Sequence, residues 1–391
     1  MPETKTKVLH ILGSLRFGGV ESWLLRLLRR MDRSRFETVF VVSELSGSEY
    51  EEEARRLGAT IELAPVSVGL VQYALNLSTI LSQRPGFDAV HSHVHAFSAV
   101  TLFLAQLHGV PVRIAHSHTD RHAVEASARL SRKAYLLLAK ALLHIVMTNG
   151  LAVTEAAAKD LFGKRYQRMR NIVVQPCGVE IEAFLQDVDR AVIRKTFGIP
   201  VDAKVIGHVG NFVQPKNHEL LIRIFAAVLA QNSNWHLVLV GSGALQAECE
   251  QQVDKLGIAH RVHFLGARSD VPALLKGLVD VFVFPSKWEG LPVALIEAQA
   301  ANLPCVISDV ISTTAIALGA SVTRLPLESD ISVWADAITE KSVARSFAPQ
   351  ADLSKFDIEN SVATLQRIYP ASKKFKQSLG SNRNALRGDA Q

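Results

Sequence analysis

Short runs of apolar, often β-branched residues alternate with longer amphipathic stretches along almost the whole chain. Helical patterns follow several of these runs, for example over about 20–30 and 50–57. Strands that alternate with helices indicate βαβ units and a parallel sheet with helices on both faces. In the first half, the expected strands lie at 7–12, 37–42, 60–63, 89–92, 112–116, 144–148 and 172–174.

The alternation pauses over 178–200 and then restarts. The later strands are expected at 205–209, 235–240, 262–265, 281–284 and 305–308, with helices at about 218–232, 245–256, 270–276 and 292–300. We therefore predict an α/β protein of two doubly wound, Rossmann-like domains that face a cleft, with functional residues in the loops after the strands. The predicted boundaries are an N-terminal domain at 1–177, a linker at 178–200, a C-terminal domain at 201–355, a closing helix at 356–370 and a basic, mobile tail at 371–391.

The composition agrees with this organisation. A chain of 391 residues exceeds one core at about 150 residues per domain. With 48% hydrophobic and 20% charged residues it is neither disordered nor collagen-like. Its three scattered cysteines form neither a disulfide framework nor a metal-ligand pattern, which favours a reducing compartment. No apolar stretch reaches about 18 residues and the start lacks a signal-peptide pattern, so we expect a cytoplasmic protein.

The formal charge of +6 is unevenly distributed. Residues 101–170 hold 11 basic against 4 acidic residues and the tail 371–391 holds 5 against 1, whereas 201–370 holds 13 against 17. Within 121–144, basic residues mix with leucines, which fits either an amphipathic helix on an anionic membrane or a solvated face over a packed helix. The absence of a recognition module and the 7% aromatic content argue against a nucleic-acid partner. The basic residues are Arg121, Arg129, Arg132, Lys133 and Lys140.

The first candidate site is the loop GSLRFGGVES at 13–22. Gly18 and Gly19 follow a strand and open a helix, where backbone N–H groups and the helix N-terminus can hold an anion. A tight turn explains the glycines equally well. The spacing does not match the dinucleotide fingerprint, which argues against a nicotinamide oxidoreductase.

The second candidate site is the segment PSKWEGLPVALIEAQAANLPCVISD at 285–309. Pro292 predicts the first position of a helix. Glu289 then lies in the loop, and Glu297 lies one turn beyond Val293 on the same helix face. Carboxylates at either end suit sugar and ribose hydroxyls, and the N–H groups between them suit a phosphate. On spacing alone, a simpler interpretation than a ligand site is that Glu289 is a solvated loop residue and that Glu297 pairs with another side chain on a helix surface.

Several motifs in this order resemble the family-4 retaining glycosyltransferases of the GT-B fold. The segment PSKWEGLPVALIEA resembles their signature, in which seven residues separate two glutamates. The similarity spans about 6–370 and also includes GGVES, VVQPCGVE, GHVGNFVQPKNHELLIRIF, LVLVGSG and VHFLGARSDV. It is strongest to the branch associated with capsular and exopolysaccharide synthesis.

The resemblance implies an acceptor domain followed by a donor domain. The enzyme would move a hexose from a nucleotide-sugar, UDP- rather than GDP-linked, to a saccharide or lipid-linked acceptor at the inner face of the membrane. The nucleotide-sugar is then a co-substrate, and no cofactor is expected. A front-face mechanism, the favoured one for the family, would need no protein nucleophile, so the paired-carboxylate rule of glycosidases does not apply.

The resemblance also implies roles for individual residues. Glu297 would bind the ribose hydroxyls, and Glu289 with the N–H groups of Gly290 and Leu291 would hold the hexose. Lys216 would neutralise the leaving diphosphate and His118 would face the donor sugar, so the catalytic residues would be Glu289, Lys216 and His118. The other implied donor-binding positions are Gly18 and Gly19 at the diphosphate, Arg268 at the base, and Asn211, Gly241 and Val293.

Three positions depart from the family pattern. Asn211 stands where family members carry an arginine, so the clamp on the diphosphate would lose a charge-assisted bond. This leaves open a non-catalytic or weakly active sugar-nucleotide-binding partner subunit. Asn302 replaces a glycine and suits a left-handed helix cap, whereas Cys177 replaces an asparagine without a functional interpretation. A sugar-nucleotide epimerase fits the architecture but not the Glu289 and Glu297 region.

Histidines alternate at two strand ends, at 91, 93 and 95 and at 116 and 118. Such spacing is compatible with a metal site, but we favour histidines that line the cleft. Asp187-Val188-Asp189 resembles a metal-binding Asp-x-Asp motif, but its place in the linker favours a solvated surface. We therefore predict no metal requirement.

Overall fold

The computed structural model describes residues 5–83, 86–119, 129–317, 319–344 and 351–369. These residues form two compact units. The N-terminal unit consists of 5–16, 20–176 and 359–369, and the C-terminal unit consists of 17–19 and 177–358. Each unit is an α/β domain built on one parallel sheet, as predicted.

The sheet of the N-terminal unit has seven strands in the order β3-β2-β1-β4-β5-β6-β7. The strands are β1 (Thr6–Leu12), β2 (Phe36–Val42), β3 (Thr60–Leu63), β4 (Ala89–Ser92), β5 (Val112–Ser117), β6 (Asn149–Ala152) and β7 (Ile172–Val174). The main helices are α1 (Gly19–Arg30), α2 (Glu49–Arg56), α3 (Leu70–Gln83), α4 (Ser98–Leu107), α6 (Leu130–Val146), α7 (Glu155–Phe162) and α15 (Ile358–Ile368). Because the order reverses between β1 and β4, the carboxyl ends of the central strands β1, β4 and β5 lie at a switch point of the sheet.

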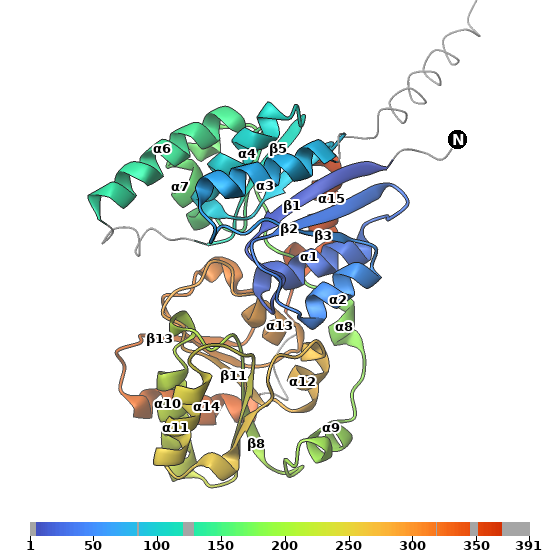
Figure 1. Ribbon diagram of the computed structural model, residues 1–391. Helices are drawn as coiled ribbons and strands as arrows, with labels where there is room; N and C mark the ends of the chain where they lie inside the picture. The colour runs from blue at the N-terminus through green and yellow to red at the C-terminus, as the bar shows by residue number, and fades with distance from the viewer. Residues whose placement is uncertain (1–4, 84–85, 120–128, 318, 345–350, 370–391) are drawn as a thin grey trace, which may run out of the picture. The chain divides into compact units, whose positions relative to one another are not determined.

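The last helix, α15, completes the N-terminal unit although it comes at the end of the described chain (Figure 1). The Trp23 indole N–H on α1 donates to Ser361 Oγ over 3.1 Å, and both groups are buried. Immediately after the helix, Tyr369 OH lies 2.8 Å from His91 Nδ1 on β4. The predicted closing helix therefore packs on the N-terminal core.

One strand prediction is wrong. The sequence pattern predicts a strand at 144–148, but α6 continues to Val146 and β6 begins at Asn149. The residues Leu136, Ala139, Leu143 and Val146 are buried at helical spacing, so the apolar run is the last turn of a core-facing helix face.

The sheet of the C-terminal unit has six strands in the order β10-β9-β8-β11-β12-β13. The strands are β8 (Lys204–Val209), β9 (Trp235–Val240), β10 (Val262–Phe264), β11 (Val281–Phe284), β12 (Cys305–Ser308) and β13 (Val322–Leu325). The main helices are α8 (Glu182–Leu185), α9 (Arg190–Thr196), α10 (His218–Gln231), α11 (Gln246–Lys255), α12 (Val271–Gly277), α13 (Val293–Ala300) and α14 (Ile331–Ala344). Strand β13 and helix α14 were not predicted.

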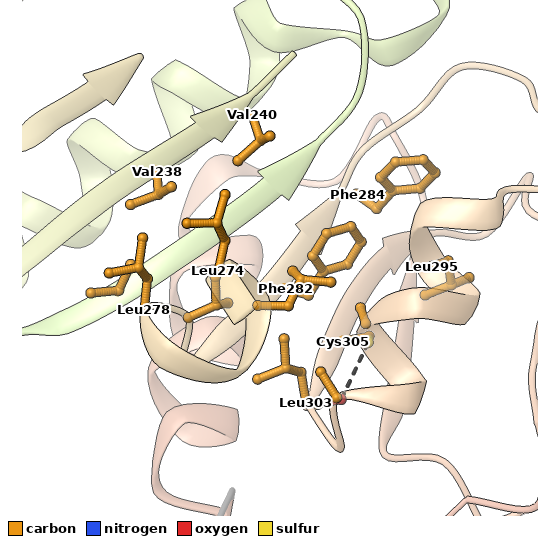
Figure 2. Close-up of a cluster of buried hydrophobic side chains, with 14 of the residues drawn as sticks. Val238, Val240, Leu274, Leu278, Phe282, Phe284, Leu295, Leu303 and Cys305 are labelled. Carbon is orange, nitrogen blue, oxygen red and sulfur yellow. Dashed lines mark hydrogen bonds between the residues drawn. The ribbon is translucent and has the colours of Figure 1, made fainter. Parts of the chain in front are cut away.

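Two apolar layers hold this sheet between its helices. On one face, Phe282 and Phe284 of β11 pack with Leu274 of α12 and Leu295 of α13 (Figure 2). On the other face, the buried residues include Trp235, Phe225 and Trp334. Successive strand residues thus serve opposite layers, as a doubly wound domain requires. All three cysteines are buried thiols outside disulfides, and the Cys305 thiol donates to the Leu303 carbonyl over 3.3 Å (Figure 2).

The segment predicted as a linker, 178–200, forms α8 and α9 and packs on the C-terminal unit. Asp280, which follows α12, forms ion pairs with both Arg190 and Arg194 of α9, with nitrogen–oxygen distances of 2.8 Å. Asp189 caps α9 by accepting hydrogen bonds from the N–H groups of Ala191 and Val192. The Asp187-Val188-Asp189 motif therefore supplies a helix cap.

Candidate functional site

The loop after β11 leads directly into the buried helix α13. Val293 is the first helical residue, so the helix begins one residue later than predicted, and Pro292 is its N-cap. Both Val293 and Glu297 are buried, and Glu297 is only 6% exposed. After the helix, Asn302 has a φ of 54°, which confirms the predicted left-handed cap. The helix thus places a buried carboxylate one turn beyond its N-terminus.

Lys216 and Glu289 form an ion pair at the edge of the same loop. Lys216 ends the short 3₁₀ helix η3 (Gln214–Lys216), and its Nζ lies 2.7 Å from Glu289 Oε1. The ammonium also lies 4.7 Å from the centroid of the Phe284 ring, in a cation–π contact. The two side chains are 19% and 12% exposed, respectively. The structure therefore brings together two residues that the sequence analysis assigned separately to the diphosphate and the hexose.

Two further hydrogen bonds fix η3 to the loop. The Lys287 N–H donates to the Pro215 carbonyl over 2.7 Å. The Asn217 side-chain amide donates to the Pro285 carbonyl over 3.1 Å. Asn217 itself adopts a φ of 56° between η3 and α10, a conformation that asparagine tolerates better than most residues. These contacts fix the backbone from which the Lys216 side chain extends.

The turns after β8 and β9 pack backbone against backbone. A Cβ atom on Gly241, whose φ is 145°, would lie 2.2 Å from the Gly210 carbonyl oxygen. The Gly241 N–H donates to the Gly266 carbonyl over 2.8 Å. Gly241 is thus required for packing, and its role toward a ligand stays a prediction. Asn211, which follows Gly210, is half-buried in the first of these turns.

Arg268 lies in the loop after β10 with its guanidinium held by a carboxylate. Its Nε and Nη2 donate to the two carboxylate oxygens of Asp270 over 2.8 and 2.7 Å. A side chain held in this way is compatible with the prediction that any base contact at Arg268 runs mainly through the backbone.

Strand β1 of the N-terminal unit is followed by the predicted turn, and α1 begins at Gly19, immediately after Gly18; the turn residues 17–19 are grouped with the C-terminal unit. Sequence reasoning missed Glu21 in the first turn of this helix. Burial raises the pKa of Glu21 to about 7, so its carboxyl group titrates near neutral pH. The sequence feature that could have identified Glu21 is its position two residues after the Gly18-Gly19 pair.

Five histidines on three neighbouring strands, or on the residue just after a strand, form one cluster, the histidine group, which comprises His10, His91, His93, His116 and His118. His93 Nδ1 lies 2.9 Å from His118 Nε2, and His93 Nε2 lies 3.1 Å from His10 Nδ1. His91 Nε2 lies 3.1 Å from His116 Nδ1, and its other ring nitrogen pairs with Tyr369. The predicted site residue His118 is thus part of a network that includes the unpredicted His10 and Tyr369.

Burial keeps this network neutral. It lowers the pKa values of His10 and His118 to about 3. The pKa values of the other three histidines fall well below the usual range, first through burial and then through repulsion by neighbouring rings. Each ring therefore carries one proton at neutral pH and has one nitrogen available to accept a hydrogen bond or to bind a metal.

His95, the third histidine of the alternating run, belongs to a different cluster. Its Nε2 lies 3.0 Å from Asp160 Oδ2 on α7, and Lys140 Nζ on α6 lies 3.1 Å from the other oxygen of this carboxylate. His95 has a φ of 52°, which turns the chain away from the direction of β4. The alternation in the sequence therefore does not continue as one ligand set.

Helix α6 carries an exposed apolar stripe on the side opposite its buried face. Leu137 and Leu138 are 72% and 73% exposed. Basic residues at 129, 132 and 133 are also exposed, whereas Arg121 lies outside the described residues. Across the described chain, every helix is too short or too polar to cross a membrane. The exposed apolar stripe comprises Leu130, Ala134, Leu137, Leu138, Ala141 and Ile145.

Comparison with known proteins identifies the family. Residues 17–183 match the family described as Glycosyltransferase Family 4, and residues 189–340 match the family described as Glycosyl transferases group 1. The putative glycosyltransferase EpsF of Bacillus subtilis (strain 168) is 33% identical, over 95% of this chain and 98% of the relative. An Escherichia coli UDP-Gal:alpha-D-GlcNAc-diphosphoundecaprenol alpha-1,3-galactosyltransferase is 27% identical, over 78% of this chain and 80% of its own length.

A solved structure shows the same fold. The crystal structure of Anabaena Alr3699/HepE in complex with UDP and glucose superposes with a TM-score of 0.75 at 20% identity, over 93% of this chain and 98% of that chain. The family matches cover strands β2 to β13 of the two sheets, the positions of Lys216 and Glu289, and helix α13 with Glu297. The chain therefore belongs to glycosyltransferase family 4 and has the GT-B fold.

Proposed function

We propose that the chain is a retaining hexosyltransferase that uses a UDP-sugar and acts on a saccharide or lipid-linked saccharide in surface polysaccharide synthesis. The observation that carries the proposal is the Lys216–Glu289 pair at the loop that leads into α13, the helix that holds the buried Glu297. UDP in the Anabaena structure and UDP-galactose in the name of the E. coli relative support the choice of base. The lipid diphosphate in the latter name supports the acceptor class.

Lys216 has the chemistry needed by a leaving diphosphate. As the bond between the anomeric carbon and the diphosphate breaks, negative charge grows on the departing oxygen, and a fixed cation lowers the barrier. Without a donor, Glu289 shares the Lys216 charge. A bound diphosphate would compete for the ammonium, which leaves Glu289 oxygens available to accept hydrogen bonds from sugar hydroxyls.

In a front-face reaction, the acceptor hydroxyl attacks the anomeric carbon from the side on which the diphosphate leaves. The new carbon–oxygen bond forms as the old one breaks, and the acceptor proton passes to a diphosphate oxygen. Neither a protein nucleophile nor a metal ion at the diphosphate takes part in this scheme. The configuration at the anomeric carbon is then retained.

The donor proposal is tested with a panel of UDP- and GDP-sugars. A UDP-sugar should raise the melting temperature, because a ligand that binds only the folded state stabilises it. The shift should disappear in Glu297→Gln and persist in Glu248→Gln, which changes an exposed carboxylate on α11 of the same unit. If no nucleotide-sugar shifts the wild-type melting temperature, the donor proposal is wrong.

We also propose that α6 contacts an anionic membrane, which would bring a cytoplasmic enzyme to a lipid-linked acceptor. The exposed apolar stripe could enter the interface between headgroups and acyl chains, and Arg129, Arg132 and Lys133 could meet anionic headgroups. Vesicles containing phosphatidylglycerol should bind the wild type and release the double variant Leu137→Gln/Leu138→Gln. The control Leu185→Gln/Val192→Gln alters exposed apolar residues of the C-terminal unit and should bind normally. Equal binding by both variants would contradict the proposal.

One observation favours a second candidate function. Asn211 provides only neutral donors where a charged clamp is usual, which suits a non-catalytic or weakly active partner subunit that still binds a sugar nucleotide. A purified Asn211→Arg variant that binds the donor but transfers to none of a range of saccharide and lipid-linked acceptors would support this alternative. Transfer by the wild type at a rate that Asn211→Arg does not raise, with retention seen by NMR of the product, would exclude it.

A further inference from the structure

We propose that the histidine group binds one divalent transition-metal ion of the zinc type, with His93, His116 and His118 as ligands. This ion would belong to the N-terminal unit and is separate from the diphosphate chemistry assigned to Lys216. The sequence analysis favoured histidines that line a cleft, and the ring positions now favour a ligand set.

The distances suit such an ion. One ring nitrogen each of His93, His116 and His118 lies within 4.8 Å of the other two. His93 Nδ1 and His118 Nε2 are 2.9 Å apart. Zinc–nitrogen bonds of about 2.0–2.1 Å in a tetrahedron separate neighbouring ligand atoms by roughly 3.3–3.4 Å. A few tenths of an ångström of outward movement would therefore convert the hydrogen bond between these two rings into two metal bonds.

An unsatisfied nitrogen selects this triad. His116 Nε2 is buried and has no hydrogen-bond partner within the described part of the chain. A buried polar atom without a partner is costly, and a metal ion would use its lone pair. The alternative triad, His10, His91 and His93, also has nitrogens within 4.8 Å of one another. Its contacts, however, are already hydrogen bonds to neighbouring rings and to Tyr369.

The remaining hydrogen bonds fit the outer layer of a metal site. With His116 Nε2 on the metal, its Nδ1–H would donate to His91 Nε2, and His91 Nδ1–H would donate to Tyr369 OH. With His93 Nδ1 on the metal, its Nε2–H would donate to His10 Nδ1. Hydrogen bonds of this kind fix the tautomer and orientation of a ligating imidazole. The protons of His91, His93 and His116 are then all accounted for.

The donor set decides which ions fit. Three neutral imidazoles suit zinc, cobalt, nickel or copper, whereas magnesium and calcium prefer oxygen ligands. Three protein ligands on a tetrahedral ion leave a fourth position for water or an anion. Since the ligating rings are neutral, the ion keeps its full charge and an anionic fourth ligand is favoured.

The test uses the full chain with its affinity tag removed, stripped with a chelator and dialysed against Co²⁺ or Zn²⁺. We expect one ion per chain by elemental analysis and the visible absorption of tetrahedral cobalt. His116→Gln and His118→Gln should lose this absorption. His91→Phe, which removes an outer hydrogen bond, should bind zinc roughly 10–100-fold more weakly in competition with a chromophoric chelator.

The matched control is His236→Gln in the C-terminal unit. His236 Nδ1 also lies 2.9 Å from another histidine, His263 Nε2, but these rings belong to neither triad. This variant should bind like the wild type. Absence of uptake by the wild type, an octahedral cobalt spectrum, or unchanged uptake by His116→Gln would each overturn the proposal. If the ligand variants do not fold, the stoichiometry and cobalt spectrum of the wild type decide.

Discussion

The histidine group lies on and just after the central strands of the N-terminal sheet, whereas the Lys216–Glu289 pair lies in segments that follow strands of the C-terminal sheet, and the two manage charge in opposite ways. Burial keeps the five imidazoles neutral, and they hydrogen-bond mainly to one another. The Lys216–Glu289 pair is a compensated ion pair whose two members are both partly exposed. The first arrangement is suited to neutral ligands of a metal ion or a sugar, and the second can exchange its internal partner for a charged substrate. Two sheets of the same kind thus carry two kinds of chemistry.

Acid should have the largest effect, and it should act on the histidine group. Below a pH of about 6.5 the unfolded chain protonates its histidines, whereas the folded His10 and His118 resist protonation until their pKa values of about 3. The unfolded state therefore binds more protons, and stability falls as the pH falls. These two residues together should cost about 5 kcal/mol between pH 6.5 and 4.5.

This cost is measurable by calorimetry or urea unfolding at several pH values. His10→Phe should reduce the loss of stability over that pH range by roughly half, or about 2 kcal/mol. His208 and His218 of the C-terminal unit, whose pKa values burial also lowers, contribute equally to both proteins and cancel in the difference. An identical pH dependence in the two proteins would show that His10 is not held neutral.

Removing the cation should have the next largest effect. Lys216→Ala should lower kcat/KM for transfer roughly 10²–10³-fold, because a fixed charge at the developing diphosphate is lost. Lys287→Ala removes an exposed lysine from the same loop and should change the rate by less than about threefold. Equal effects of the two variants would mean that Lys216 acts only through general electrostatics.

Adding a positive charge at position 211 should have the opposite effect to removing the charge of Lys216. Asn211→Arg should raise kcat/KM roughly 10–150-fold, which corresponds to a charge-assisted hydrogen bond of about 1.5–3 kcal/mol. Asn211→Gln keeps a neutral amide and should not show this gain. An unchanged rate in the arginine variant would indicate that Lys216 alone neutralises the diphosphate.

The smallest expected effect concerns Tyr369. Tyr369→Phe removes the hydroxyl that pairs with His91 Nδ1 and should destabilise the protein by about 1–2 kcal/mol, because a buried ring nitrogen loses its partner. Tyr135→Phe, at a half-buried position on α6, should stay within about 0.5 kcal/mol of the wild type. If Tyr369→Phe left the stability unchanged, the imidazole network would have to rearrange so that His91 Nδ1 finds another hydrogen-bond partner.

Most central strands of both sheets could be predicted from the sequence, because each is a short apolar run bounded by polar or glycine-rich turns. The two failures have different causes. The run at 144–148 satisfies both a strand and a core-facing helix turn, and only packing decides between them. Strand β13 is a partly exposed strand at the edge of its sheet and lacks a continuous apolar run, so its pattern was too weak to recognise.

The residues of the donor loop could be named from the sequence, but their contacts could not. Lys216 and Glu289 are 73 residues apart, and their pairing depends on how η3 is fixed to the loop after β11. Tyr369 meets His91 across 278 residues, because α15 packs on the N-terminal core. Such contacts follow from the assembled sheets and helices, and no local spacing encodes them.

The position of α15 has a consequence for the order of events during protein synthesis. The strands of the C-terminal unit are contiguous, so this unit can fold while the ribosome is still translating the rest of the chain. The first unit to be translated cannot bury Trp23 against Ser361, or join His91 to Tyr369, until α15 and Tyr369 have been made. A nascent chain stalled before residue 358 should therefore expose an unfinished N-terminal core to chaperones and proteases.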